Sequence, residues 1–87
     1  MINFKQRELS QMLFDELKKQ FPELELINIV ESPENPNSIW VRVIMPDNED
    51  REFEVREMAS EISADILMNY GYHILVISAL KQEPSFV

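Results

Sequence analysis

The first apolar pattern in the chain has the spacing of a helix. Its apolar residues recur at three- and four-residue steps: Leu9, Met12, Leu13, Leu17 and Phe21. Asn3 followed by Gln6 has the form of a capping box, in which each side chain accepts a hydrogen bond from the other residue's backbone N–H. Pro22 disfavours helical geometry at the residue before it. We therefore predict a helix over residues 3–20.

Two strand patterns follow this helix. Residues 24–31 are rich in β-branched side chains and predict the first strand. A loop with two prolines leads to residues 38–45, where side chains alternate between two faces. One face carries Ile39, Val41, Val43 and Met45, and the other carries Trp40, Arg42 and Ile44. Pro46 ends this second strand.

A second helical pattern covers residues 55–70, and no glycine or proline interrupts it. Its apolar residues are Val55, Met58, Ala59, Ile62, Ile66 and Tyr70. Gly71, the only glycine in the chain, has the position of a left-handed helix cap. Residues 47–54 are compatible with a hairpin arm or with the start of this helix. Phe53 is out of phase with the helical pattern, which favours an extended or turning start.

Residues 72–80 form the last predicted strand. Both of its faces are apolar, which is typical of a central strand that is covered on both sides. Because the second helix joins the last two strands, a right-handed crossover makes these strands parallel. The order helix, strand, strand, helix, strand predicts a single two-layer α/β (α+β) domain over residues 1–87, with both helices on one face of a small mixed sheet.

Two helices cannot cover both faces of this sheet. The face with Trp40 and Ile44 therefore stays open, and so does the second face of the last strand, which carries Leu75, Ile77 and Ala79. An apolar face of that size commonly meets another protein chain. A symmetric homodimer is the commonest such arrangement. The residues that we expect at this interface are Trp40, Arg42, Ile44, Tyr72 and Ile74.

Charge and composition narrow the classes of function. The chain has 16 acidic and 8 basic residues, a formal net charge of −8, and no cysteine. This charge opposes non-specific binding to nucleic acid or to an anionic membrane. The absence of cysteine excludes disulfides and thiolate metal sites. Charged residues near the N-terminus argue against a signal peptide, and no apolar run approaches the roughly 20 residues of a membrane span. We therefore expect a cytosolic protein.

No residue pattern points to a catalytic site, a metal site or a cofactor. The acidic segment 47–54 lacks the glycine turn and the alternating oxygen ligands of a calcium loop. His73 is the only histidine, so a zinc site or a catalytic triad has too few residues to form it. A single glycine cannot build a phosphate-binding loop. We therefore expect no enzyme activity and no cofactor.

Residues 56–78 resemble the last helix and strand of small nucleotidyltransferase domains, in which a helix ending in a Tyr-Gly pair precedes an aromatic, polar, apolar strand. Residues 39–47 are similar to the second strand of that family, and residues 21–24 to the segment before its first strand. The family binds nucleotide phosphates with a Gly-Ser pair and holds magnesium with two carboxylates. The matching positions here are Glu31-Ser32-Pro33 and Ile39-Trp40-Val41. The resemblance implies a reduced, catalytically incomplete relative whose fold serves binding.

The type II KH-like fold has the same order of elements. Its RNA-binding form needs a Gly-x-x-Gly loop and a positive groove, and this chain has neither. The main prediction is a non-catalytic cytosolic protein that acts through protein–protein contacts, as a homodimer or an accessory subunit. The alternatives are a degenerate nucleotide-binding domain of the nucleotidyltransferase type and a KH-like RNA-binding module. Membranes and nucleic acid are not expected as partners.

Overall fold

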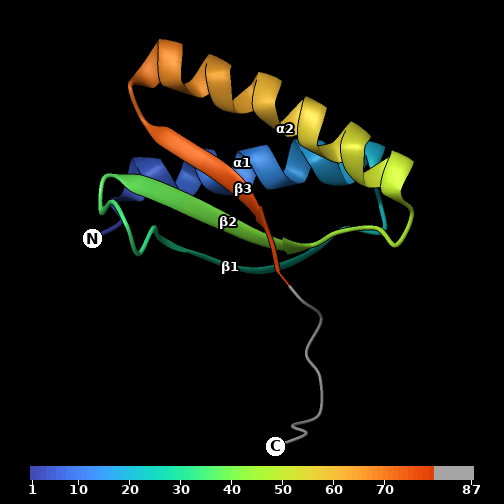
Figure 1. The fold of residues 1–87 in the computed structure, drawn as a ribbon. Coiled ribbons are helices and arrows are strands. Elements are labelled where there is room, and N and C mark those ends of the chain that lie inside the picture. Colours follow the sequence, from blue (N-terminus) through green and yellow to red (C-terminus); the bar gives the residue numbers. More distant parts are fainter. Residues whose placement is uncertain (80–87) are drawn as a thin grey trace, which may run out of the picture.

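The computed structural model describes residues 1–79. Within them the elements are α1 (Phe4–Gln20), β1 (Glu25–Glu31), β2 (Ser38–Ile44), α2 (Glu49–Tyr70) and β3 (His73–Ser78) (Figure 1). The predicted order and the α+β fold class are confirmed. The predicted end of the last strand at residue 80 lies outside the described residues. None of the described helices is long and apolar enough to cross a membrane.

Helix α1 begins as its sequence predicts. The Gln6 N–H donates to Asn3 Oδ1 at 2.7 Å, and the Asn3 N–H donates to Gln6 Oε1 at 2.9 Å, which completes the capping box. At the other end, the Phe21 N–H donates to the carbonyl oxygen of Leu17 at 2.8 Å. One member of the predicted apolar stripe needs correction, because Met12 is exposed and Phe14 is buried in its place.

The three strands form one sheet in the order β1-β2-β3. β1 and β2 are antiparallel, whereas β2 and β3 are parallel, as the right-handed crossover predicts. The prediction that the last strand is central is wrong, since β2 occupies the centre and β3 the edge. An apolar pattern on both sides of a strand reports what lies over its two faces. It carries no information about whether a neighbouring strand pairs with each edge.

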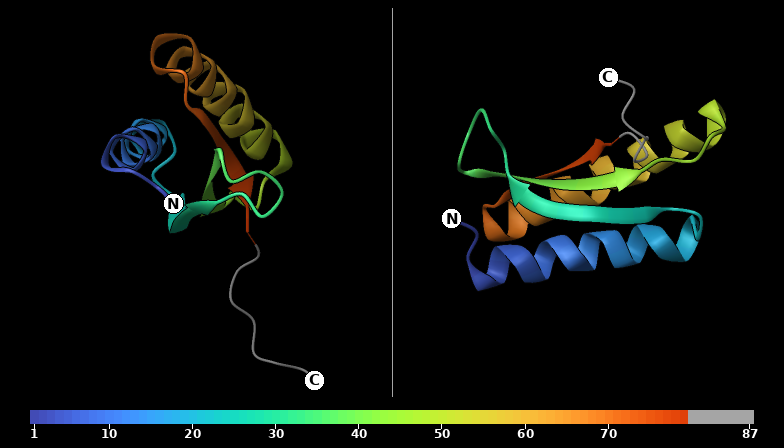
Figure 2. Two further views of the ribbon diagram at one scale, coloured as in Figure 1. Left: turned by 90° about the vertical axis from the view of Figure 1, so that its left-hand side faces the viewer. Right: turned by 90° about the horizontal axis from the view of Figure 1, so that it is seen from below.

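Both helices pack on one face of the sheet, and no helix within residues 1–79 lies over the other face (Figure 2). Alternate residues of the strands point into the space between the two layers and form the core with the buried sides of the helices. The strand residues of this core are Ile29, Ile39, Val41, Val43 and Ile74. The two-layer arrangement predicted from the element order is confirmed.

Helix α2 begins at Glu49, well before the predicted start at residue 55. Asn48 is its N-cap, and the Asn48 Oδ1 accepts a hydrogen bond from the Arg51 N–H at 2.9 Å. Phe53 lies within the helix, on its solvent side, where its side chain is 62% exposed. Its mismatch with the buried stripe therefore does not mark a break in the helix. The expectation of an extended segment at 47–54 is therefore corrected for the residues from Glu49 onward. An N-cap asparagine followed by an acidic first turn was the signal for this start.

The end of α2 depends on the backbone conformation of Gly71. Its φ of 77° lies in the left-handed region, and its N–H donates to the carbonyl oxygen of Leu67 at 2.9 Å. The predicted glycine cap is confirmed.

We expect Gly71→Ala to lower the free energy of unfolding by about 1–2 kcal/mol, because a Cβ is disfavoured at this φ. Apart from its chain neighbours, no atom of the described residues lies within 4 Å of the position of an added Cβ, so we attribute the effect to backbone strain. Chemical denaturation of the two proteins measures the difference. Gly71→Asn is the comparison, since asparagine tolerates this conformation better. Equal losses for both variants would contradict the explanation.

Candidate protein interface

The open face of the sheet is a half-buried apolar surface centred on β2. The strand register places Trp40 between Val30 of β1 and Leu75 of β3. Arg42 lies in the next pair of positions, between Asn28 and Ile77. No described helix packs on this side of the sheet. We call the side chains of Val30, Trp40, Arg42, Ile44, Leu75 and Ile77 the open face; all six are partly exposed.

Three of the five predicted interface residues, Trp40, Arg42 and Ile44, lie on the open face. Ile74 does not, and this prediction needs correction: its side chain is 1% exposed and lies in the core beside Ile39. Tyr72 precedes β3 and packs against the core. Alternation along a strand puts Ile74 and Leu75 on opposite faces, and only the register with β2 decides which of them faces the helices.

Val30, Leu75 and Ile77 lie on the open face but are not among the five predicted interface residues. Their signal was present in part, because the last strand has two apolar faces and Leu75 and Ile77 share one of them. The missing information was the pairing of Leu75 with Trp40, which no local pattern contains.

Arg42 is the only charged side chain of the open face. Its Nη1 donates to Asn28 Oδ1 at 3.3 Å, so the asparagine orients the guanidinium. No carboxylate that the structure describes forms an ion pair with it. The centre of the open face therefore combines apolar side chains with one cation that still has donor groups to offer.

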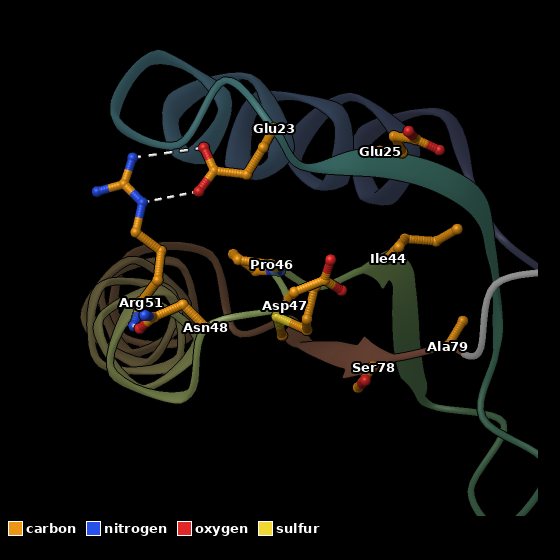
Figure 3. A pocket seen from close by; sticks show the side chains of 10 residues that line it. Glu23, Glu25, Ile44, Pro46, Asp47, Asn48, Arg51, Ser78 and Ala79 are labelled. Carbon is orange, nitrogen blue, oxygen red and sulfur yellow. Dashed lines mark hydrogen bonds and ion pairs between the residues drawn. The ribbon is translucent and has the colours of Figure 1, made fainter.

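A pocket of about 640 Å³ adjoins the open face where β2 and β3 end and α2 begins (Figure 3). Ile44 belongs to both surfaces. The pocket is lined by Glu23, Glu25, Ile44, Met45, Pro46, Asp47, Asn48, Arg51, Ser78 and Ala79. Its charged side chains are three carboxylates and one arginine.

The arginine of this pocket is already engaged. Arg51 Nε donates to Glu23 Oε2 at 2.7 Å (Figure 3). Arg51 Nη2 donates to the carbonyl oxygen of Gln20 at 3.2 Å. The guanidinium also lies over the ring of Phe21, 4.7 Å from its centre. Arg51 thus joins the start of α2 to the turn between α1 and β1. The two remaining carboxylates, Glu25 and Asp47, make the pocket unsuitable for an anion such as a phosphate.

This ion pair shifts the titration of both partners. The hydrogen bond from Arg51 holds the pKa of Glu23 below its ordinary value of 4.5, and the hydrogen bond to Glu23 raises the pKa of Arg51. A carboxyl group whose pKa is lowered by folding stabilises the protein above its unfolded pKa. That contribution is lost as the pH falls through the folded pKa.

We therefore expect Glu23→Gln to lower the melting temperature near pH 7 and to lower it progressively less as the pH falls to about 2. Thermal unfolding of both proteins across this range measures the difference. Glu25→Gln is the matched control, because Glu25 forms no ion pair among the described residues. If Glu23→Gln lowers the melting temperature by the same amount at every pH, the stabilising effect is not due to the ionised Glu23 carboxylate.

A serine and a histidine meet at the other end of the parallel strands. Ser38 Oγ lies 2.8 Å from His73 Nδ1, which joins the first residues of β2 and β3. Ser38 is 5% exposed, so its hydroxyl is not accessible to a substrate. This contact is best explained as a link between the two strands.

Acidic residues do not gather into a metal site either. Within residues 1–79, no group of three or more histidine, aspartate or glutamate side chains is arranged to hold an ion. Comparison of the chain with protein-family models, with curated proteins and with solved structures finds no match. The open face and the pocket beside it are therefore the basis for a functional proposal.

Proposed function

We propose that this chain is a non-catalytic cytosolic protein that acts through protein–protein contacts, as a homodimer or an accessory subunit, and that the open face is its binding surface. The observation that carries the proposal is an apolar surface that no described helix covers, made by Trp40, Ile44, Leu75 and Ile77. An apolar patch on one side of a sheet costs free energy in water, and covering it with another protein recovers that energy.

The chemistry of the open face indicates what its partner offers. Apolar side chains surround Arg42, the single cation, so a complementary surface has apolar side chains around a carboxylate. Trp40 lies at the centre of the patch, with Val30 and Leu75 beside it in the neighbouring strands. Tryptophan and arginine at the centre of an interface carry a large share of binding energy. We therefore expect Trp40 and Arg42 to dominate binding.

The two alternatives lack a supporting contact. A nucleotide-binding domain needs donors for phosphate, but the pocket beside the open face has Glu25 and Asp47 facing it and its arginine paired with Glu23. An RNA-binding module needs a positive surface, whereas the chain carries a net charge of −8 and the open face has one cation. Both fit the observed charges less well than a protein partner does.

Site-specific photocrosslinking tests the proposal. The photoreactive amino acid p-benzoylphenylalanine replaces Ile77 on the open face or, as the control, Glu57 on the exposed side of α2. We expect a defined protein adduct in the cells that make this protein from position 77 and not from position 57. Mass spectrometry should place the crosslink in an apolar segment containing Asp or Glu. Identical adducts from both positions, or none from position 77, would overturn the proposal.

Direct titration tests the alternatives. Calorimetry with ATP and GTP in the presence of magnesium is expected to give no binding heat. Electrophoresis with single-stranded RNA at low salt, where phosphate contacts are strongest, is expected to show no shift. Binding of either ligand that is lost in Trp40→Glu would replace the proposed function with the corresponding alternative.

A further inference from the structure

The outer edge of β3 offers backbone groups that pair with no strand in residues 1–79. The Ala79 N–H donates to the carbonyl oxygen of Val43 at 2.7 Å, so the backbone of Ala79 is directed toward β2. Successive residues of a strand direct their N–H and C=O groups to opposite sides. The backbone groups of Ile74, Val76 and Ser78 are therefore directed away from β2, toward an edge that no described strand pairs with. In Figure 1 this edge faces the viewer, and α2 lies above it.

The two edges of the sheet differ in their protection against further pairing. β1 has a bulge between Leu26 and Asn28 and glutamates at both ends. Bulges and charged side chains are the usual means by which an edge strand is kept from pairing. β3 has the sequence His-Ile-Leu-Val-Ile-Ser, with no bulge, no proline and no formally charged residue. β3 is thus the edge at which another strand can be added.

The side of α2 next to this edge lacks carboxylates from Phe53 onward. Phe53, Ser60 and Leu67 follow one another at seven-residue spacing and so form one stripe along the helix. Phe53 is 62% exposed and Leu67 is 45% exposed. Ser60 and Arg56 line a small hollow together with Leu75 and Val76 of β3, so the stripe borders the strand edge.

Five of the seven acidic residues of α2 lie on another side of the helix. At about 100° per residue these five form a separate stripe: Asp50, Glu54, Glu57, Glu61 and Asp65. The other two, Glu49 and Glu52 in the first turn, line a hollow together with Phe53 and Arg56. A chain with a net charge of −8 repels its own copies over most of its surface. The edge of β3 and the stripe beside it form a surface on which two copies can meet without placing carboxylates opposite each other.

We propose that a second copy of this chain pairs with β3 in antiparallel orientation, around a two-fold axis at Val76. This inference rests on the homodimer of the proposed function and assigns its interface to the strand edge rather than to the open face. In this register Ile74 lies opposite Ser78 of the second copy, and the outward backbone groups form about six hydrogen bonds. The product is a continuous sheet made from both copies, a common form of strand addition.

The same axis brings the two α2 helices together at Ser60, where a small side chain permits close approach. Phe53 and Leu67 are equally spaced on either side of Ser60, so Phe53 of one copy meets Leu67 of the other. Each exposed apolar side chain of the stripe in one copy is thereby covered by the opposite end of the stripe in the other copy. The surface is self-complementary, as a two-fold interface requires. The two open faces then lie on the same side of the joined sheet, where one assembly can bind two partner segments.

Analytical ultracentrifugation over a concentration series tests this arrangement. We expect the full chain to be a dimer and Ser60→Glu to raise its dissociation constant at least about tenfold, because two carboxylates then meet at the axis. Ser78→Pro, which removes an outward N–H, should act in the same direction. Met68→Glu is the matched control, because Met68 is exposed on the acidic side of α2. The dissociation constant of the Met68→Glu dimer should stay within about twofold of that of the unsubstituted chain.

Charge complementation tests the register. Ser60→Glu and Ser60→Lys should each be monomeric alone, and their mixture should form a heterodimer, because position 60 faces itself across the axis. Circular dichroism of each variant checks that the fold is retained. A mixture that stays monomeric while the unsubstituted chain is a dimer would overturn the proposed register.

The outcomes separate this inference from the proposed function. A chain that is monomeric at all concentrations overturns the edge-paired dimer, whereas an adduct from Ile77 would still support binding by the open face. A dimer that survives Ser60→Glu and Ser78→Pro but dissociates in Trp40→Glu overturns the edge and places self-association on the open face. If position 77 gives no adduct but the chain forms a dimer that Ser60→Glu dissociates, binding by the open face is overturned and the edge-paired dimer is supported.

Discussion

Ile74→Ala is expected to lower the free energy of unfolding by about 2–5 kcal/mol, whereas Leu75→Ala is expected to lower it by less than about 1.5 kcal/mol. The two side chains are adjacent in β3 and similar in size. Ile74 is 1% exposed and lies in the core between the sheet and the helices, so truncation leaves a cavity. Leu75 lies on the open face and is already partly in contact with water.

Chemical denaturation measures both changes, provided that the m-value, the slope of the free energy of unfolding against denaturant concentration, is the same for each protein. A domain of this size has a free energy of unfolding of only about 5–10 kcal/mol, so Ile74→Ala is a large fraction of the total. If Ile74→Ala does not fold, Ile74→Val serves instead and should lose about 1 kcal/mol. Equal losses at positions 74 and 75 would contradict the assignment of the two faces of β3. A larger loss at Leu75 would reverse it.

Trp40→Glu is expected to reduce the crosslinked adduct from position 77 by at least about tenfold, the second large effect. The substitution places a carboxylate next to Arg42 at the centre of the open face. It removes the largest apolar side chain there and gives Arg42 an intramolecular partner. Both changes weaken the binding of a partner that offers apolar side chains and a carboxylate. Quantitative mass spectrometry of the adduct measures the loss.

Phe4→Glu is the matched control for this experiment. It also replaces an exposed aromatic residue by a carboxylate, but on α1, away from the open face. We expect it to leave the adduct unchanged. Trp40→Glu should retain the circular dichroism spectrum of the fold, since Trp40 does not belong to the core cluster. An undiminished adduct in folded Trp40→Glu would remove Trp40 from the binding surface.

The clearest agreement between sequence and structure lies at the ends of the helices. Asn3 and Gln6 form the capping box that their spacing predicts, and Gly71 adopts the left-handed conformation that its position predicts. These features depend on residues within four positions of one another. The alternation along β2 is equally local, and it placed Trp40, Arg42 and Ile44 on a face without a helix.

The start of α2 was predictable from its cap but was obscured by its side-chain pattern. Phe53 breaks the buried stripe, and an exposed aromatic residue resembles a break in the helix when only apolar spacing is considered. Asn48 and the acidic residues after it define the start independently of burial. Capping is therefore better evidence for a helix boundary than the first member of the apolar stripe.

The sequence by itself determined the local elements of this protein, its two-layer fold class and the presence of an apolar sheet face without enough helices to cover it. Only the tertiary structure decided that β2 is central, that Ile74 faces the helices while Leu75 does not, and that no described strand pairs with the outer edge of β3. The reason is the range of the interactions. Caps and alternation act over a few residues, whereas strand order and register depend on contacts such as that between Ser38 and His73, which are 35 residues apart. A strand with two apolar faces satisfies the local pattern in either orientation, and the packing of α2 over β3 selects one of them.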